Sequence, residues 1–484
     1  MEHLPPRVPH APPPDLPPRR GHRRVRRGRL RPPDSVSTSR QAVARGRSRT
    51  PSAALDTLTV RPFRRYLLGQ LTSNIGTWMQ RAAQDLLVLH LTGNSGSAVG
   101  VVTALQFLPQ TLFGLAGGFL ADRFPKRRLL LITQTGMAVQ SLLLGLLTVT
   151  GAVTLSSLYT LALILGTATA VDSPARNAFI SELVSRERVA AAVGLNSAQF
   201  NVARILGPAA AGLTVAAVGT GPVFLINAVS YLTVLYGLIT IPTGAPREHS
   251  EPQRGGPWLT EALRHITATR ELLLPITLIA VVGTFGLNFQ VTIALVAIKV
   301  FHSGAAAFGY LSAAYAVGSL IGAILTAHGG RLPTARRLVT ATAVFGVLEA
   351  TLGLMPGYGT FMALLIPTGY AAVTVTTTAN ALTQLHAAPH LRGRVLSVYF
   401  LVLLGGTPIG APLVGLISDT FGARSSLILG GTVSAFSALA LSALATERRL
   451  WARPRQAAGP AGAPLSDTSV ARTSGEARAT RSTP

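Results

Sequence analysis

The sequence predicts an all-α membrane protein of twelve transmembrane helices, arranged as two six-helix halves related by a pseudo-two-fold axis. Three observations predict this fold class: apolar runs long enough to cross a bilayer, basic residues on one side of them, and residue pairs that recur about 200 positions apart. Charged residues make up only 13% of the 484 positions. Cysteine is absent, and neither Lys126 nor Lys299 follows a P-loop glycine, so thiolate sites and P-loop nucleotide hydrolysis are excluded.

The apolar runs lie between residues 61 and 446, and each is long enough to cross about 30 Å of hydrocarbon as a helix. Short polar turns, or turns that contain Gly or Pro, separate most of them. The first, fourth, fifth and tenth runs carry more polar residues than the others. The expected spans are 66–91, 98–121, 129–150, 154–173, 191–217, 221–241, 273–298, 304–327, 337–355, 359–382, 395–418 and 425–446.

The basic residues between the spans predict the orientation. Turns after even-numbered spans hold sixteen Arg and Lys residues, whereas turns after odd-numbered spans hold only Lys299 and Arg424. Because basic residues stay on the cytoplasmic side, we expect both termini in the cytoplasm and the chain in the cell membrane. The segment from Trp258 to Ile266, in the long central loop, has the pattern of a short amphipathic helix on the membrane surface.

Recurring residues divide the spans into two halves of like orientation. Gly114 and Gly118 recur as Gly318 and Gly322. Parallel halves of this kind are a known transporter plan, with the substrate held between them near the midplane. The expected halves are residues 61–242 and 273–446, joined by a cytoplasmic linker at 243–272.

The terminal segments 1–60 and 447–484 are rich in Arg and Pro or Ser and have no apolar runs, so we expect them to be disordered. They hold about half of the net charge of +25, so this charge does not predict a nucleic-acid partner. The N-terminal segment could attract anionic membrane lipid, or part of it could lie outside the natural product. It has no apolar core of a secretory signal.

The turn after the second span carries one acid among basic residues: Gly118-Phe-Leu-Ala-Asp122-Arg123-Phe-Pro-Lys126-Arg127-Arg128. It resembles the major facilitator superfamily signature G-x-L-A-D-R-x-G-R-R-x, with Pro125 in place of a glycine. The resemblance implies a conformational latch, in which Asp122 pairs in one state and is released in the other. The alternative is that these basic residues only set the orientation.

The fifth span carries small residues and one proline at Gly194, Ala203, Gly207, Pro208 and Gly212. This spacing is similar to the antiporter motif of facilitator-superfamily exporters, with alanine at two of the glycine positions. Small residues allow close helix packing, and a proline allows a bend. The resemblance favours export over import, although small-residue faces occur in most membrane bundles.

Three further passages carry a resemblance over residues 61–446: Gly76–Asp85, Asp172–Phe179 and Arg392–Val395. They are similar to the transmembrane secretion effector family, which contains enterobactin-exporter-like and macrolide-efflux-like proteins. The resemblance implies the major facilitator fold without enzymatic activity, cofactor or metal. We expect a monomer, although the sequence excludes neither a monomer nor a dimer. The resemblance also implies export of an amphipathic drug, siderophore or secondary metabolite, with the proton as coupling ion. The alternatives are an importer of the same fold and a non-transporting sensor or scaffold.

Polar residues of the first span follow one helix face and are candidates for a substrate cavity. Arg81 and Asp85 are four positions apart, so they could pair with each other, or Asp85 could bind the coupling proton. The stripe consists of Gln70, Asn74, Thr77, Arg81, Gln84 and Asp85.

Arg204 lies near the middle of the fifth span, with no carboxylate within four residues. We expect it to face the interior, either as an anion-binding residue or as a hydrogen-bonded structural arginine. In the seventh span Asn288 lies between Thr284 and Thr292 on a matching polar face, and Gln290 lies off that face.

Overall fold

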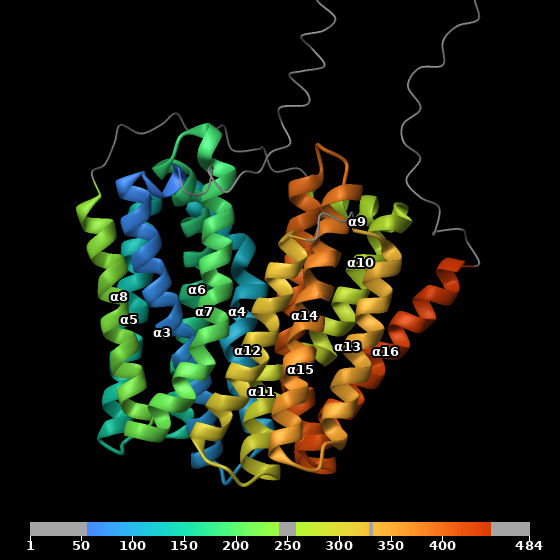
Figure 1. Cartoon of the computed structure of the whole chain (residues 1–484). Coiled ribbons are helices and arrows are strands. Elements are labelled where there is room, and N and C mark those ends of the chain that lie inside the picture. Colours follow the sequence, from blue (N-terminus) through green and yellow to red (C-terminus); the bar gives the residue numbers. More distant parts are fainter. Residues whose placement is uncertain (1–55, 242–257, 329–332, 447–484) are drawn as a thin grey trace, which may run out of the picture. The chain divides into compact units, whose positions relative to one another are not determined.

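A computed structural model describes residues 56–241, 258–328 and 333–446, and these residues are almost wholly helical. Six long helices form the N-terminal half (Figure 1). Most of them lie close to the predicted spans, although the first begins earlier, at Arg61. These helices are α3 (Arg61–Leu91), α4 (Gly96–Arg123), α5 (Lys126–Val149), α6 (Leu155–Leu183), α7 (Val189–Val218) and α8 (Thr220–Thr240).

The C-terminal half matches its predicted spans in the same way, with one exception. The seventh span is not one regular helix, because the π-helical segments η3 (Val282–Gly286) and η4 (Val296–Val300) flank a short α-helix. A side chain at Gly410 would overlap the backbone of this broken region. The half consists of α10 (Arg270–Val281), α11 (Phe289–Leu295), α12 (Ala305–His328), α13 (Ala335–Leu354), α14 (Tyr358–His386), α15 (Arg392–Phe421) and α16 (Ala423–Thr446).

Local sequence explains where several helices begin and end. The Ser95 hydroxyl caps α4 by accepting a hydrogen bond from the backbone N–H of Ala98 at 3.3 Å. Gly219 and Gly422 separate the last two helices of each half, with φ angles of 83° and 89°. Only glycine adopts this backbone conformation readily, so the same turn recurs at matching places in the two halves.

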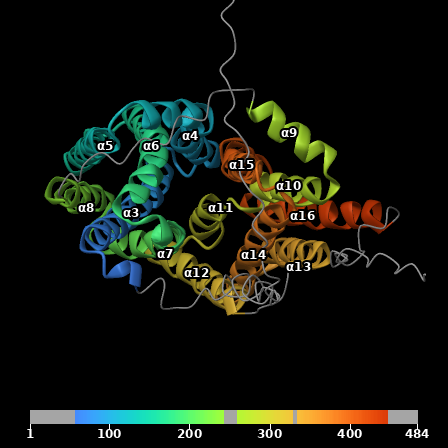
Figure 2. The same ribbon diagram turned by 90° about the horizontal axis from the view of Figure 1, so that it is seen from above.

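Most of the contact between the two halves is made by two helix pairs, α4 with α15 and α7 with α12. Small residues allow this approach, since side chains at Gly100 and Gly415 would overlap the backbone of the opposite half. The helix α11 contacts α3 and α4 as well as α12, α15 and α16, so it lies where the halves meet (Figure 2). The central part of the chain therefore carries contacts from both halves.

Within the described residues, eleven helical segments are long and apolar enough to cross a membrane. The helix α3 is not among them, because many of its residues are polar. Large apolar side chains stay exposed on the outside of the helices, for example Ile132 at 70% and Phe436 at 71%. These observations describe an all-helical membrane protein. The twelfth crossing and the pseudo-two-fold symmetry remain predictions.

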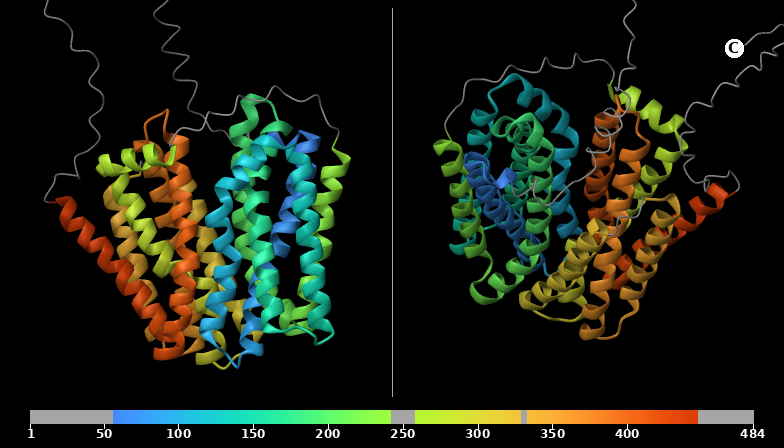
Figure 3. Two further views of the ribbon diagram at one scale, coloured as in Figure 1. Left: turned by 180° about the vertical axis from the view of Figure 1, so that it is seen from behind. Right: turned by 45° about the horizontal axis from the view of Figure 1, so that its top comes forward.

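The predicted linker contains the helix α9 (Trp258–Ala268), which lies across the beginning of α15 (Figure 3). The structure has a helix at the predicted place, and its apolar residues pack on protein. Its docking on a membrane surface stays a prediction. Ala262 and Ile266 are buried against protein residues that include Val395, whereas Leu263 is 44% exposed. Residues 243–257 of the linker, 1–55 and 447–484 lie outside the described residues. Residues 56–58 form a helical turn.

Candidate functional site

Most polar residues between Gln70 and Asp85 of α3 are buried, because this helix packs between α7 and α8. They therefore need hydrogen-bond partners from neighbouring helices. The Gln84 carbonyl accepts a bond from the side chain of Gln106 in α4 at 3.0 Å. Gln80 lies off the predicted stripe, yet it bonds with Gln140 of α5 at 3.0 Å and Asn227 of α8 at 2.8 Å. Polar residues thus occupy more than one face of α3.

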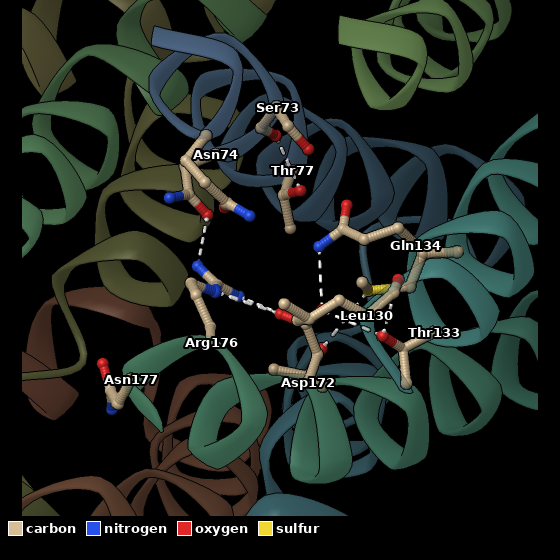
Figure 4. Close-up of polar contacts among 12 residues, drawn as sticks. Ser73, Asn74, Thr77, Leu130, Thr133, Gln134, Asp172, Arg176 and Asn177 are labelled. Carbon is tan, nitrogen blue, oxygen red and sulfur yellow. Dashed lines mark hydrogen bonds and ion pairs between the residues drawn. The ribbon is translucent and has the colours of Figure 1, made fainter. Parts of the chain in front are cut away.

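A buried ion pair organises the interior of the N-terminal half (Figure 4). Asp172 is fully buried in α6 and pairs with Arg176 one turn later. The other carboxylate oxygen of Asp172 accepts hydrogen bonds from Thr133 at 3.0 Å and Gln134 at 2.8 Å, both in α5. This carboxylate is therefore satisfied within its own half.

Arg176 connects this ion pair to the predicted candidate Asn74. The guanidinium donates to the Asn74 side-chain oxygen at 3.1 Å, and the Asn74 amide donates to Gln199 of α7 at 3.0 Å. The network joins α3, α5, α6 and α7. The predicted fourth span, 154–173, ends before Arg176 and so leaves this residue in a turn. That assignment was wrong, because α6 extends to Leu183 and contains Arg176. Its spacing of four residues from Asp172 was the available signal.

Arg81 and Asp85 do not form an ion pair in the described structure. The Arg81 guanidinium lies over the rings of Trp78 and Phe107, 5.0 and 4.4 Å from their centroids. Its Nε atom is buried and has no hydrogen-bond partner among the described residues. The intrahelical pairing considered from the sequence is therefore absent.

Asp85 instead connects the two halves. It is fully buried, and its Oδ2 atom accepts a hydrogen bond from Gln290 of α11 at 2.6 Å. Its Oδ1 atom lies 3.5 Å from the donating hydroxyl of Thr103 in α4. The sequence predicted that Gln290 lies off the polar face of Asn288 and gave it no role. Its bond to Asp85 depends on packing between the halves, which the periodicity of one helix does not show.

Asn288 precedes α11 at the break after η3, and its amide donates to the Thr284 carbonyl at 2.7 Å. The Thr292 hydroxyl donates to the Asn288 carbonyl at 3.2 Å. The polar face of Thr284, Asn288 and Thr292 stays a prediction. The side-chain oxygen of Asn288 has no hydrogen-bond partner among the described residues. Gly410 of α15 lies directly against it, so a side chain there would overlap the Asn288 amide at 2.7 Å.

The small residues of α7 pack on two different neighbours. Ala203 is fully buried, and a side chain at Gly207 would overlap Trp78 of α3. A side chain at Gly212 would overlap Gly309 of α12, in the other half. Gly194 has open space around it, so close packing does not require glycine there. Pro208 lies inside α7 between these two contacts.

Arg204 is exposed on α7 and forms no ion pair or hydrogen bond with a described residue. Its guanidinium interacts electrostatically with the hydroxyl groups of Tyr315 in α12 and Tyr399 in α15. Both tyrosines belong to the C-terminal half, so the charge of Arg204 acts across the contact between the halves.

Two of the four basic residues of the predicted latch, Lys126 and Arg127, contact groups of their own half. Lys126 lies 3.6 Å from the Glu182 carboxylate of α6, and Arg127 donates to the Ile239 carbonyl of α8 at 2.8 Å. Asp122, Arg123 and Arg128 are exposed, and Gly118 has open space around it. Asp122 has no ion pair or hydrogen bond with any described residue.

At the opposite end of α4, the sequence analysis missed an acidic residue that fastens the halves together. The Oδ1 atom of Asp419 in α15 accepts bonds from the Gly96 backbone N–H at 2.7 Å and from Lys299 at 2.8 Å. Its Oδ2 atom accepts from the Ser97 backbone N–H at 2.8 Å and the Ser95 hydroxyl at 3.2 Å. No sequence motif marks this contact, because its main partners are backbone groups of a distant helix.

Residues 52–477 match a protein family described as transmembrane secretion effector. The chain belongs to this family. Family members similar to this chain are transporters of the major facilitator type rather than enzymes. A staphyloferrin A transporter of Staphylococcus aureus is 24% identical, over 74% of this chain and 89% of its own length. The multidrug efflux pump Tap of Mycobacterium tuberculosis is 26% identical, over 75% and 88%. Macrolide efflux protein A of Streptococcus pyogenes is 24% identical, over 72% and 88%.

Solved structures agree on the fold of this secretion effector. A bacterial homologue of the human lysosomal transporter Spinster, inward-facing and occupied, superimposes with a TM-score of 0.63 at 16% identity. That match covers 80% of this chain and 97% of the homologue. The nucleoside transporter NupG superimposes with a TM-score of 0.62 at 12% identity, over 79% and 98%. The predicted major facilitator fold is therefore confirmed.

Proposed function

We propose that this protein is a secondary active exporter that moves an amphipathic small molecule out of a bacterial cell by alternating access, in exchange for protons. Its family and the efflux functions of its relatives support transport and favour the outward direction. The observation that supports alternating access is that the two ends of the contact between the halves differ. Asp419 joins them at one end of α4, whereas Asp122 is unengaged at the other.

The basic residues indicate which end of the contact between the halves faces the cytoplasm. They favour a cytoplasmic position for the Asp122 end and for both termini. The described conformation is then closed toward the outside, and it is the state in which an exporter would load its substrate from the cytoplasm. Release to the outside would require the Asp419 contacts to break and the Asp122 end to close.

Asp85 is the residue best placed to bind the coupling proton. It is a buried carboxylate near the Asp419 end, and among the described residues Arg81 is the charged group that acts on it. As a carboxylate it accepts the hydrogen bond from Gln290, and protonation would remove its charge at the contact between the halves. A proton arriving from outside would thereby favour separation of the halves at that end.

Inverted membrane vesicles containing the full chain test this proposal. Labelled erythromycin, ethidium and staphyloferrin A serve as probes, with and without a protonophore. We expect gradient-dependent accumulation of at least one probe, which the protonophore abolishes. Accumulation only in right-side-out vesicles would establish an importer instead. Binding of a probe without any flux in either orientation would indicate a sensor or scaffold.

A matched variant tests the coupling. Asp85→Asn keeps the acceptor oxygen for Gln290 but cannot titrate. We expect this variant to exchange labelled for unlabelled probe across the membrane while it loses gradient-driven accumulation. Gradient-driven accumulation at the wild-type rate would rule out Asp85 as the proton site.

A further inference from the structure

The helix α7 presents three different surfaces. Its small residues, including Ala203 and Gly207, are buried against α3. Its exposed apolar residues, including Val202 and Leu206, form a second surface. The third surface is polar and contains Arg204. Positions 197, 201, 204, 208 and 212 follow the spacing of a single helix face, and they hold Ser197, Asn201, Arg204, Pro208 and Gly212.

The direction of this polar surface follows from its two ends. Gly212 packs on Gly309 of the C-terminal half, so the same face of α7 is turned toward that half. Arg204 lies two turns earlier on this face and is within electrostatic range of Tyr315 and Tyr399 of the C-terminal half. An exposed guanidinium therefore faces the region between the halves.

The charge of Arg204 is not neutralised within the described structure. Asp172 is paired with Arg176, and Asp85 is bonded to Gln290. Glu349 also interacts with Tyr315, but it is 2% exposed and is enclosed by η3 and α16. A cation near the middle of a transmembrane helix is unfavourable without water or a counter-ion.

An aromatic surface lies one turn from the guanidinium. Phe200 is 38% exposed and meets Trp78 edge to face, with 5.9 Å between the ring centroids. Trp78 in turn lies 6.3 Å from Phe107. The polar face of α7 thus presents a positive charge beside an exposed ring.

We propose that the exported molecule is an organic anion with an aromatic or apolar body. Arg204 binds its anionic group, for which a guanidinium offers two parallel hydrogen bonds to a carboxylate. Phe200 contacts its body. This inference rests on the proposed export function and names the substrate class for it.

Binding to matched acid and amide pairs tests the inference. The full chain is purified into nanodiscs of phosphatidylcholine, which contain no anionic lipid headgroup that could compete. Equilibrium dialysis then measures the affinities of 2-naphthoate against 2-naphthamide and of indole-3-acetate against indole-3-acetamide. We expect wild-type protein to prefer the acid by about tenfold in at least one pair, as suits a charge-assisted bidentate contact.

Two substitutions at one position separate charge from folding. Arg204→Gln should lower acid binding by about tenfold and leave amide binding unchanged, whereas Arg204→Lys should retain part of the preference. Phe200→Leu should weaken the acid and the amide equally. Arg264→Gln removes an exposed arginine from α9 and serves as the control. Either a wild-type protein without acid preference or an Arg204→Gln protein that keeps it would overturn the inference.

The vesicle assay distinguishes this inference from the export proposal. Gradient-driven flux of a neutral or cationic probe without acid preference would overturn the anion site alone. An acid preference that depends on Arg204, without gradient-driven flux of the preferred acid, would support the site and overturn the export mechanism.

Discussion

The two ends of the contact between the halves carry the same kind of residue in different surroundings. Asp419 accepts hydrogen bonds from Lys299, Ser95 and two backbone N–H groups at the start of α4. Asp122 lies at the other end of the same helix and contacts none of the described polar groups. The backbone explains part of this difference, because a helix offers unpaired N–H groups at its first turn and carbonyl groups at its last.

If Asp122 engages in the same way as Asp419, it needs the beginning of a helix in the other half. Asp419 has the beginning of α4, and the corresponding partner for Asp122 would be the beginning of α15. In the described conformation α9 lies at the beginning of α15 instead, and Glu261 of α9 forms an ion pair with Arg394 of α15. The same pairing chemistry could therefore operate at either end, and the engaged end would define the conformational state.

The largest expected effect is at Asp419. Asp419→Asn removes the negative charge to which Lys299 and two backbone N–H groups donate hydrogen bonds. A hydrogen bond to a charged group contributes roughly 1.5–3 kcal/mol to stability. Because the chain has no cysteine, Ser418→Cys provides a unique probe at a buried position of this end. We expect Asp419→Asn to raise its labelling rate by a membrane-impermeant maleimide by about tenfold or more. An unchanged rate would show that Asp419 does not hold this end closed.

Asp122→Asn should change the labelling rate at Ser418→Cys in the opposite direction. The described conformation does not use Asp122, so removing its charge should destabilise only the alternative state. We expect labelling at Ser418→Cys to fall and transport to drop strongly, while the protein still reaches the membrane. Transport at the wild-type rate would rule out a latch at this residue.

Arg81 offers a smaller test, at the Asp419 end. Arg81→Ala removes the cation that lies over Trp78 and Phe107 without breaking the bond between Asp85 and Gln290. We expect the pH dependence of transport to shift while transport continues, as measured by probe efflux between pH 5.5 and pH 8.5 in roughly half-unit steps. Complete and pH-independent loss would contradict this assignment.

The smallest effect should follow deletion of the N-terminal segment. Its composition predicts no folded core, so removing residues 2–55 should leave insertion, orientation and transport nearly unchanged. The deletion must stop there, because Thr57 is fully buried and Leu58 packs against the core of the N-terminal half. Normal insertion with lost transport would assign a function to the segment. Truncation at residue 58 is the matched comparison and should reduce thermal stability.

The sequence by itself determined the helical membrane fold and the family, because long apolar runs and local motifs are properties of contiguous residues. It also identified Asp85 and Arg204, since a charge inside an apolar run is visible without knowledge of its neighbours. Only the tertiary structure decided their partners. Gln290 reaches Asp85 across the contact between the halves, and Asp419 reaches α4 through backbone groups that carry no sequence signal. Which residues pair across more than 200 positions depends on how the helices pack. The periodicity of residues along one helix contains no information on that packing.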